Sequence, residues 1–453
     1  MTEFVNKLVS VVPSERQIKW QETEFYAFIH YGINQFTNRE WGTGNESPSI
    51  FNPQKLDTDQ WCACVKMAGM RGIIITAKHH DGFCLWDTKH TRHSTMYSPY
   101  GKDIVAQLAS SCAKHALKLG IYLSPWDRHD SRYGQGEPYD AYFCAQLGEL
   151  LTNYGEIFCV WLDGACGEGA NGKAQVYDWQ RYYALIRELQ PGAVISVCGP
   201  DVRWCGNEAG HCRKNEWSVV PRSMIDNEAI RENSQQADDA AFRRRVPSEE
   251  QDLGSRQALI DYDKKGHGEL AWYPAEVNTS IRPGWFYHAE EDDKVRSLEE
   301  LASIYIQSVG GNATFLLNVP PHPQGYIAAQ DANRLAEFGR WLEDSFRENL
   351  LTQASFTASN QSGELNEQWV MAETAHAISP HFFVLQEEIR ESQRIEEFCL
   401  LYWNGAAWTE ACSGGAVGYK RICRLRAAIS SNKWMLRIPA SRGPAVIKTF
   451  ALY

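Results

Sequence analysis

Short β-rich segments alternate with amphipathic stretches over roughly the first 320 residues of this 453-residue chain. The clearest strands are expected at 25–31, 72–76, 120–123, 157–162 and 193–197, with further ones at 216–219, 270–276 and 313–318. Helical stretches lie between them at 103–117, 139–154, 177–189 and 298–308. Strands that alternate with helices predict a parallel sheet. About eight such repeats, without a Gly-rich GxGxxG turn after the first strand, favour a (β/α)8-like TIM barrel over a dinucleotide-binding fold.

The pattern of residues along the chain changes after the proline-rich segment 320–323. One more helix is expected at 331–346, and beyond about residue 350 the pattern becomes strand-like, as in 434–438 and 446–450. Turn signals at 404–405 and 414–415 separate these runs. We therefore expect two domains, a catalytic barrel at 1–346 and a small C-terminal antiparallel β-sandwich at 347–453.

Composition narrows the classes of partner. A net charge of −11 and a pI near 5.7 leave no basic surplus to neutralise phosphates, so neither nucleic acid nor an anionic membrane is expected to bind. The 16 Trp and 20 Tyr residues suit an amphipathic neutral ligand such as a sugar, although most such rings fill cores. The 13 cysteines follow no framework spacing and are expected to be free thiols.

No secretory signal or apolar run of 18 residues is recognisable in the sequence. A cytoplasmic enzyme is the simplest expectation, although a chain trimmed of an export signal would look the same. The sequence does not predict an oligomeric state.

Polar side chains follow several of the predicted strands. Asp163 ends the run 157–162, His79 and His80 follow 72–76, and His30 follows an apolar run in 25–31. In a TIM barrel the chemistry lies at the carboxyl ends of the strands and in the loops that follow them. Trp126 falls at such a strand end as well.

Two carboxyl groups are needed to hydrolyse a glycosidic bond with retention: one attacks the anomeric carbon, and the other protonates the departing oxygen. Asp163 is the candidate nucleophile. Glu208, in a glycine-flanked segment after the next predicted strand, is the candidate acid/base. Glu216, Glu269 and Glu276 also lie near predicted strand ends and are its rivals.

Four motifs occur in one order along the chain: Lys78-His79-His80-Asp81-Gly82-Phe83, Trp161-Leu162-Asp163-Gly164-Ala165, Gly206-Asn207-Glu208-Ala209-Gly210, and Ser280-Ile281-Arg282-Pro283-Gly284-Trp285-Phe286-Tyr287. In these motifs the chain resembles the retaining α-L-fucosidases of glycoside hydrolase family 29. It resembles in particular the branch that removes α-1,3/1,4-linked fucose from branched oligosaccharides.

The resemblance implies a role for each matched residue. Asp163 is similar to the family nucleophile and Glu208 to the acid/base of that branch. Trp285 lies in a loop typical of the branch. The implied substrate is a fucosylated oligosaccharide, with no cofactor and no metal. The residues expected to hold the sugar are His30, Glu40, Trp41, His79, His80, Trp126, Trp161 and Trp285.

Two other classes of function stay open at this point. His79 and His80, with Asp81 and Asp163, could indicate a barrel metallohydrolase, but adjacent residues of an extended segment point to opposite faces and rarely share one ion. The chain could instead be an inactive or transferase-like carbohydrate-binding barrel, or could bind glycans through its C-terminal sandwich.

Overall fold

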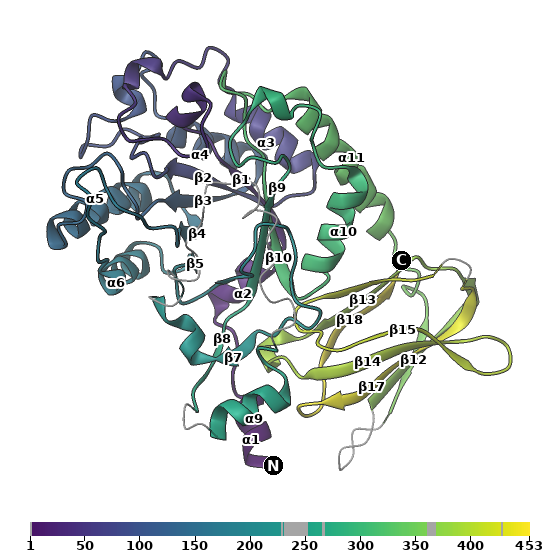
Figure 1. The fold of residues 1–453 in the computed structure, drawn as a ribbon. Helices are drawn as coiled ribbons and strands as arrows, with labels where there is room; N and C mark the ends of the chain where they lie inside the picture. The colour runs from purple at the N-terminus through teal and green to yellow at the C-terminus, as the bar shows by residue number, and fades with distance from the viewer. Residues whose placement is uncertain (1, 228–229, 231–251, 265–267, 360–367, 427–428) are drawn as a thin grey trace.

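The computed structural model describes residues 2–227, 230, 252–264, 268–359, 368–426 and 429–453. Two parts are evident in Figure 1: a barrel surrounded by helices, and a smaller all-β part near the C-terminus. They correspond to the predicted barrel followed by a sandwich. Helix α11 (Ala329–Phe346) is the last helix of the barrel part, and strand β11 begins at Ser355. The exact domain division, 1–346 and 347–453, stays a prediction.

Eight parallel strands form the wall of the barrel, in the order β5-β4-β3-β2-β1-β10-β9-β6. An isolated parallel bridge between Ser196 and Val202 joins the two ends of this order, so the ring is nearly closed. The strands are β1 (Phe25–Ile29), β2 (Gly72–Lys78), β3 (Lys118–Leu123), β4 (Ile157–Leu162), β5 (Val194–Val197), β6 (Arg203–Trp204), β9 (Ala275–Ser280) and β10 (Ala313–Asn318).

Two of the expected barrel strands, 216–219 and 270–276, are placed differently, and the second is divided between β8 (Leu270–Trp272), which lies outside the barrel, and the start of β9. The segment expected at 216–219 contributes only the start of β7 (Val219–Pro221), which pairs antiparallel with β8 outside the barrel. The sixth barrel strand is instead the two-residue β6, and no helix separates it from β5. A strand of two residues shows no periodicity in sequence, so only its pairing with β9 defines it.

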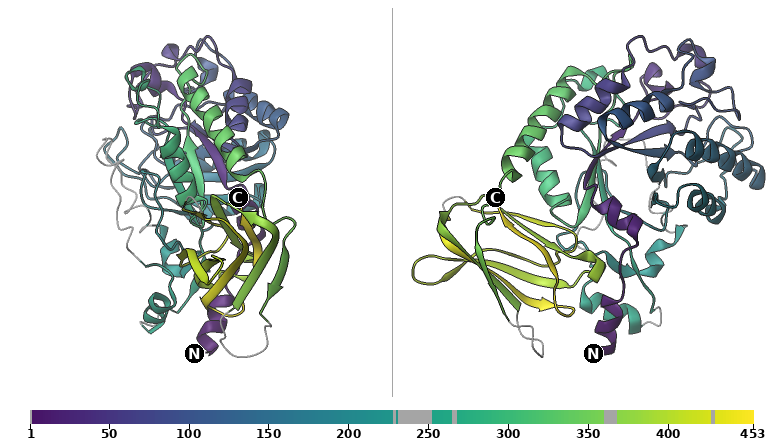
Figure 2. Two further views of the ribbon diagram at one scale, coloured as in Figure 1. Left: turned by 90° about the vertical axis from the view of Figure 1, so that its right-hand side faces the viewer. Right: turned by 180° about the vertical axis from the view of Figure 1, so that it is seen from behind.

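Helices cover the outside of the barrel, as Figures 1 and 2 show. Several begin where an aspartate side chain caps the first turn: Asp57, Asp103 and Asp178 each accept a hydrogen bond from a backbone N–H of the helix that follows. The covering helices are α3 (Thr58–Met67), α4 (Ile104–His115), α5 (Glu137–Asn153), α6 (Trp179–Leu189), α10 (Leu298–Ser308) and α11. No helix in the described part of the chain is long and apolar enough to cross a membrane.

The barrel interior is filled by aromatic side chains. Tyr26, Phe28, Tyr122 and Trp161 alternate inward from β1, β3 and β4, and all four are buried. The Tyr122 and Trp161 rings stack with centroids 5.4 Å apart, because the two residues are partners in the β3–β4 register. The core therefore supports the carboxyl-end side chains from below with rigid rings.

The C-terminal part is an antiparallel β-sandwich. One sheet has the order β11-β12-β17-β14-β15 and the other β16-β13-β18. Phe382 of the smaller sheet packs on Phe346 and Trp341 of α11, so that sheet faces the barrel. The strands are β11 (Ser355–Ala358), β12 (Gln368–Ile378), β13 (Phe382–Glu387), β14 (Ile395–Trp403), β15 (Trp408–Gly414), β16 (Arg421–Arg424), β17 (Ser431–Ser441) and β18 (Ile447–Leu452).

Candidate active site

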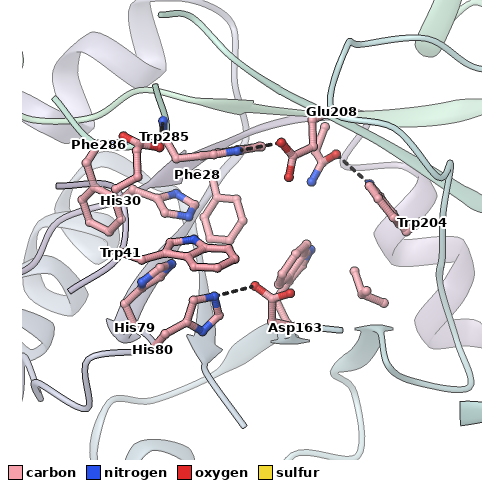
Figure 3. A pocket seen from close by; sticks show the side chains of 14 residues that line it. Phe28, His30, Trp41, His79, His80, Asp163, Trp204, Glu208, Trp285 and Phe286 are labelled. Atoms are coloured by element: carbon pink, nitrogen blue, oxygen red, sulfur yellow. Dashed lines mark hydrogen bonds and ion pairs between the residues drawn. The ribbon is translucent and has the colours of Figure 1, made fainter. Parts of the chain in front are cut away.

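A pocket opens among the carboxyl ends of the barrel strands (Figure 3). Its empty space is about 520 Å³ including the open mouth. Both candidate carboxylates line it. The complete lining is Phe28, His30, Glu40, Trp41, His79, His80, Trp161, Asp163, Val197, Trp204, Glu208, Asn278, Trp285 and Phe286.

Asp163 follows β4 directly and is buried. Tyr122 donates a hydrogen bond to its Oδ2 atom at 2.8 Å, and the backbone N–H of Ala165 donates to Oδ1 at 2.8 Å. Burial raises the pKa of Asp163, and these donors, with the N–H of Gly164, act in the opposite direction. The donors favour the ionised carboxylate and so counteract part of the effect of burial.

Glu208 lies in the loop after β6 and is also buried. The indole Nε1 of Trp285 donates to its Oε2 atom at 3.0 Å. The loop owes its shape to Asn207, whose side-chain oxygen accepts from the N–H groups of Ala209 and His211 and whose amide donates to the carbonyl of His211. Hydrogen bonds of the Asn207 side chain thus stabilise the turn from which Glu208 extends into the pocket.

The three other glutamates considered as the acid/base lie outside the pocket lining. Glu216 forms a buried ion pair with Arg203 at 2.6 Å. Glu276 is enclosed inside the barrel, where it accepts from Tyr26 and from the indole of Trp161. The Glu269 side chain is 79% exposed. None of the three lines the pocket.

His30 presents a hydrogen-bond acceptor to the pocket. Asn318 donates its amide hydrogens to Ser280 Oγ and to the carbonyl of Trp285, which leaves Asn318 Oδ1 to accept from His30 Nδ1 at 2.9 Å. Burial lowers the pKa of His30 to about 4, so the ring is neutral near pH 7 and its Nε2 carries a lone pair.

The His80 ring is likewise oriented by a hydrogen bond at its Nδ1 atom. Ser124 donates its hydroxyl hydrogen to the carbonyl of Trp126, so it accepts from His80 Nδ1 at 2.8 Å. Burial lowers the pKa of His80 to about 3. Its Nε2 lies 3.9 Å from Asp163 Oδ2, and because both atoms are acceptors, the two groups do not hydrogen-bond to each other. Burial also lowers the pKa of neighbouring His79.

Aromatic rings form the rest of the wall. Trp161 is held by Glu276, and Trp285 lies near His30 with ring centroids 5.1 Å apart. Trp41 meets the His80 ring edge-on at 5.6 Å. Trp126, expected at the site, is not among the lining residues; it packs on Trp41 at 5.4 Å and donates its indole N–H to the carbonyl of Glu168. The structure places Trp126 behind the pocket wall.

Glu40 lines the pocket, but its carboxylate oxygens also hold a neighbouring loop. Oε2 accepts from the N–H of Trp285 at 2.8 Å, and Oε1 accepts from the N–H of Phe286 at 3.0 Å. His288 contacts Oε1 at 2.8 Å. These contacts tie the loop after β9 to the segment after β1.

Sequence reasoning missed several groups that shape the pocket. Tyr122 and Phe28 alternate inward on predicted strands, a signal that was available. Asn318, at the end of β10, was available on the same strand-end argument. Val197 could not have been found: it ends β5 with a φ of 66°, rare for a β-branched residue, because the chain turns at once toward β6.

The metallohydrolase alternative has little geometric basis. Among the described residues there is no group of three His, Cys, Asp or Glu side chains arranged to hold a metal ion. The His80 ring directs one nitrogen to Ser124 and the other toward Asp163.

Two buried carboxylates, neutral imidazoles and indole rings around one pocket at the carboxyl end of a parallel barrel define a glycoside hydrolase. The family model for α-L-fucosidases matches residues 8–345. The chain belongs to the α-L-fucosidases of glycoside hydrolase family 29.

Individual relatives agree with this assignment. The chain is 37% identical to α-L-fucosidase 1 of Arabidopsis thaliana, over 98% of this chain and 87% of the relative. A Bacteroides ovatus structure attributed to the α-L-fucosidases is 42% identical with a TM-score of 0.89, covering 100% of this chain and 75% of the other. A family 29 fucosidase of Ruminococcus gnavus, solved in complex with fucose, is 28% identical with a TM-score of 0.82, covering 98% and 95%.

Proposed function

We propose that this α-L-fucosidase acts by retention, with Asp163 as the nucleophile and Glu208 as the acid/base. The observation that carries the proposal is that both carboxylates line one pocket from different strand-end loops. Their surroundings differ: Asp163 receives a phenol and backbone donors, whereas Glu208 receives an indole. Such a difference allows one acid to be ionised while the other carries the proton.

In the first step, Asp163 attacks the anomeric carbon of fucose as the glycosidic C–O bond breaks. Glu208 gives its proton to the departing oxygen, so the aglycone leaves as an alcohol and a covalent fucosyl-enzyme forms. In the second step, Glu208 takes a proton from water. The resulting hydroxide attacks the anomeric carbon and breaks its bond to the Asp163 oxygen, so the carboxylate is freed and α-L-fucose leaves with its original anomeric configuration.

Recognition of the sugar is assigned to the pocket wall. The lone pairs on His30 Nε2 and His80 Nε2 would accept from fucose hydroxyls. A sugar that lacked a hydroxyl, or carried it inverted, would leave these buried acceptors unpaired, which costs free energy. Phe28, Trp285 and Phe286 supply an apolar side to the pocket. Such a side suits the methyl group that fucose carries in place of a hydroxymethyl.

We further propose selectivity for α-1,3/1,4-linked fucose in branched oligosaccharides. Support comes from the segment 206–210, which resembles the acid/base motif of that branch and holds Glu208 in the pocket. The proposed substrate is the non-reducing fucose of a branched glycan, removed by exo action.

A hydrolysis panel tests the proposal. An aryl α-L-fucoside, a Lewis-type branched trisaccharide and 2′-fucosyllactose are compared, and the first-formed anomer is followed by NMR. We expect the branched trisaccharide to be preferred over 2′-fucosyllactose and α-fucose to appear first. Initial release of β-fucose would exclude retention, and faster cleavage of 2′-fucosyllactose would contradict the linkage assignment.

A further inference from the structure

His288 lies just beyond the motif that contains Trp285 and does not line the pocket. Its Nε2 is 2.8 Å from Glu40 Oε1, and its Nδ1 is 2.7 Å from Asn38 Oδ1. Both ring nitrogens face acceptor oxygens, which favours the imidazolium form, and the hydrogen bond to Glu40 raises the pKa of His288. The side chains of His288 and Glu40 are only 14% and 11% exposed. A charge-assisted hydrogen bond in such a shielded place is stronger than a surface ion pair.

Glu40 transmits this contact to the loop after β9. Its two oxygens accept from the consecutive N–H groups of Trp285 and Phe286. The close approach depends on Gly284, because a Cβ atom there would lie 2.8 Å from Glu40 Oε1 and 3.0 Å from the His288 ring. On its other side, the carbonyl of Trp285 accepts from Asn318 at 2.7 Å. The backbone of Trp285 is thus held at both its N–H and its carbonyl.

The indole of Trp285 is the end of this chain of contacts. With its backbone held, the indole Nε1 donates to Glu208 Oε2 at 3.0 Å (Figure 3). The contacts therefore run from His288 through Glu40 and Trp285 to the proposed acid/base. A displacement of the loop would move the indole N–H away from the carboxylate, and a misplacement of about 1 Å can cost on the order of 100-fold in rate.

We propose that His288 is a positioning residue that acts through Glu40 to hold the Trp285 indole against Glu208. This inference rests on the proposed role of Glu208 as acid/base. It also gives Glu40 a second role: besides lining the pocket, its carboxylate fixes the loop that orients the acid/base.

The proposal predicts a dependence on the leaving group. Protonation by Glu208 matters most when the departing group is a sugar alcohol and least when it is an acidic phenol. His288→Leu removes both ring donors. We expect it to lower kcat/KM for the branched trisaccharide about tenfold and for a nitrophenyl fucoside less than about threefold. His288→Gln keeps one neutral donor toward Glu40 and should recover part of the loss on the trisaccharide.

A double-mutant cycle sharpens the test. If His288 acts through the Trp285 indole, Trp285→Phe should show the same leaving-group dependence, and adding His288→Leu should lower the trisaccharide rate little further. His376→Leu, which changes an exposed histidine on β12, is the matched control and should leave both rates unchanged. Thermal unfolding of each variant shows whether it has folded.

Equal losses on both substrates would overturn the inference, because they would indicate a purely structural role. Independent, multiplicative losses for the two substitutions would overturn it as well. Glu208→Ala separates this failure from a failure of the proposed function. If Glu208→Ala cleaves the trisaccharide at the parent rate, the acid/base assignment itself is wrong. If it does not, and His288→Leu shows no leaving-group dependence, only the positioning role is wrong.

Discussion

The phenol of Tyr122 donates to Asp163 Oδ2 at 2.8 Å from the neighbouring strand. This hydrogen bond favours the ionised form of the proposed nucleophile and so opposes the burial that raises the pKa of Asp163. If Asp163 is the nucleophile, as proposed, it must be ionised to attack, so the acidic limb of the pH profile of kcat/KM should reflect this balance.

Tyr122→Phe removes one of the groups that lower the pKa of Asp163. The acidic limb should therefore move to higher pH, and kcat at neutral pH should fall by about tenfold or more. The measurement is kcat/KM for an aryl fucoside across pH. Tyr97→Phe, at a ring that is 57% exposed, is the control and should leave the profile in place. An unmoved limb would mean that another group sets it.

Asp163→Asn should abolish turnover, by about 10³-fold or more, because the amide cannot form the fucosyl ester. The fold should persist, since the substitution is nearly isosteric, and circular dichroism checks this. Added azide should restore some activity and yield β-fucosyl azide, the product of direct displacement from the opposite face. Activity at the parent level would place the nucleophile elsewhere.

Glu208→Ala should lose far more activity on the branched trisaccharide than on an aryl fucoside, since only the former needs a proton on its leaving group. Azide should accelerate breakdown of the intermediate and give α-fucosyl azide, which NMR distinguishes from the β-anomer. Glu269→Ala changes an exposed rival and serves as the control. Loss of activity in Glu269→Ala would contradict the assignment of Glu208 as the acid/base.

Glu276 should make the stability of the barrel depend on pH. Burial raises its pKa to about 7 from the ordinary 4.5, although Tyr26, Trp161 and Ser196 donate to it. A folded-state pKa above the unfolded value means that the folded state binds more protons, so the free energy of unfolding falls as pH rises through the window from 4.5 to about 7.

Glu276→Gln should remove this dependence. Between pH 5 and 8 the parent protein should lose up to about 3 kcal/mol of unfolding free energy relative to the variant. Denaturant titrations at several pH values measure the difference. Parallel pH curves for parent and variant would show that the carboxyl is already ionised at low pH.

Several parts of the fold were predictable because local pattern and tertiary context agree. Strands β4 and β10 have the bounds expected from their apolar runs, and α10 likewise. Strand β6 was not predictable, since two residues carry no period. Its membership of the barrel depends on pairing with β9, more than 70 residues later in the chain.

Some residues of the candidate site were likewise predictable from local sequence pattern, and others were not. Asp163, His30, His79 and His80 follow apolar strands, and the barrel rule brings such residues to one edge. Glu208 needed the family motif, because three other glutamates lie near predicted strand ends. The structure separates them: one is ion-paired, one is inside the barrel and one is exposed.

The amino-acid order alone determined the class of fold and which side chains stand at strand ends, because strand alternation and burial are local properties. Only the tertiary structure decided how those side chains are used. It placed Trp126 behind the wall, made the pocket nitrogens of His30 and His80 acceptors, and joined Glu40 to the Trp285 loop. Each of these depends on a hydrogen-bond partner or a ring from another strand or loop, and no local pattern encodes which distant residue will be that partner.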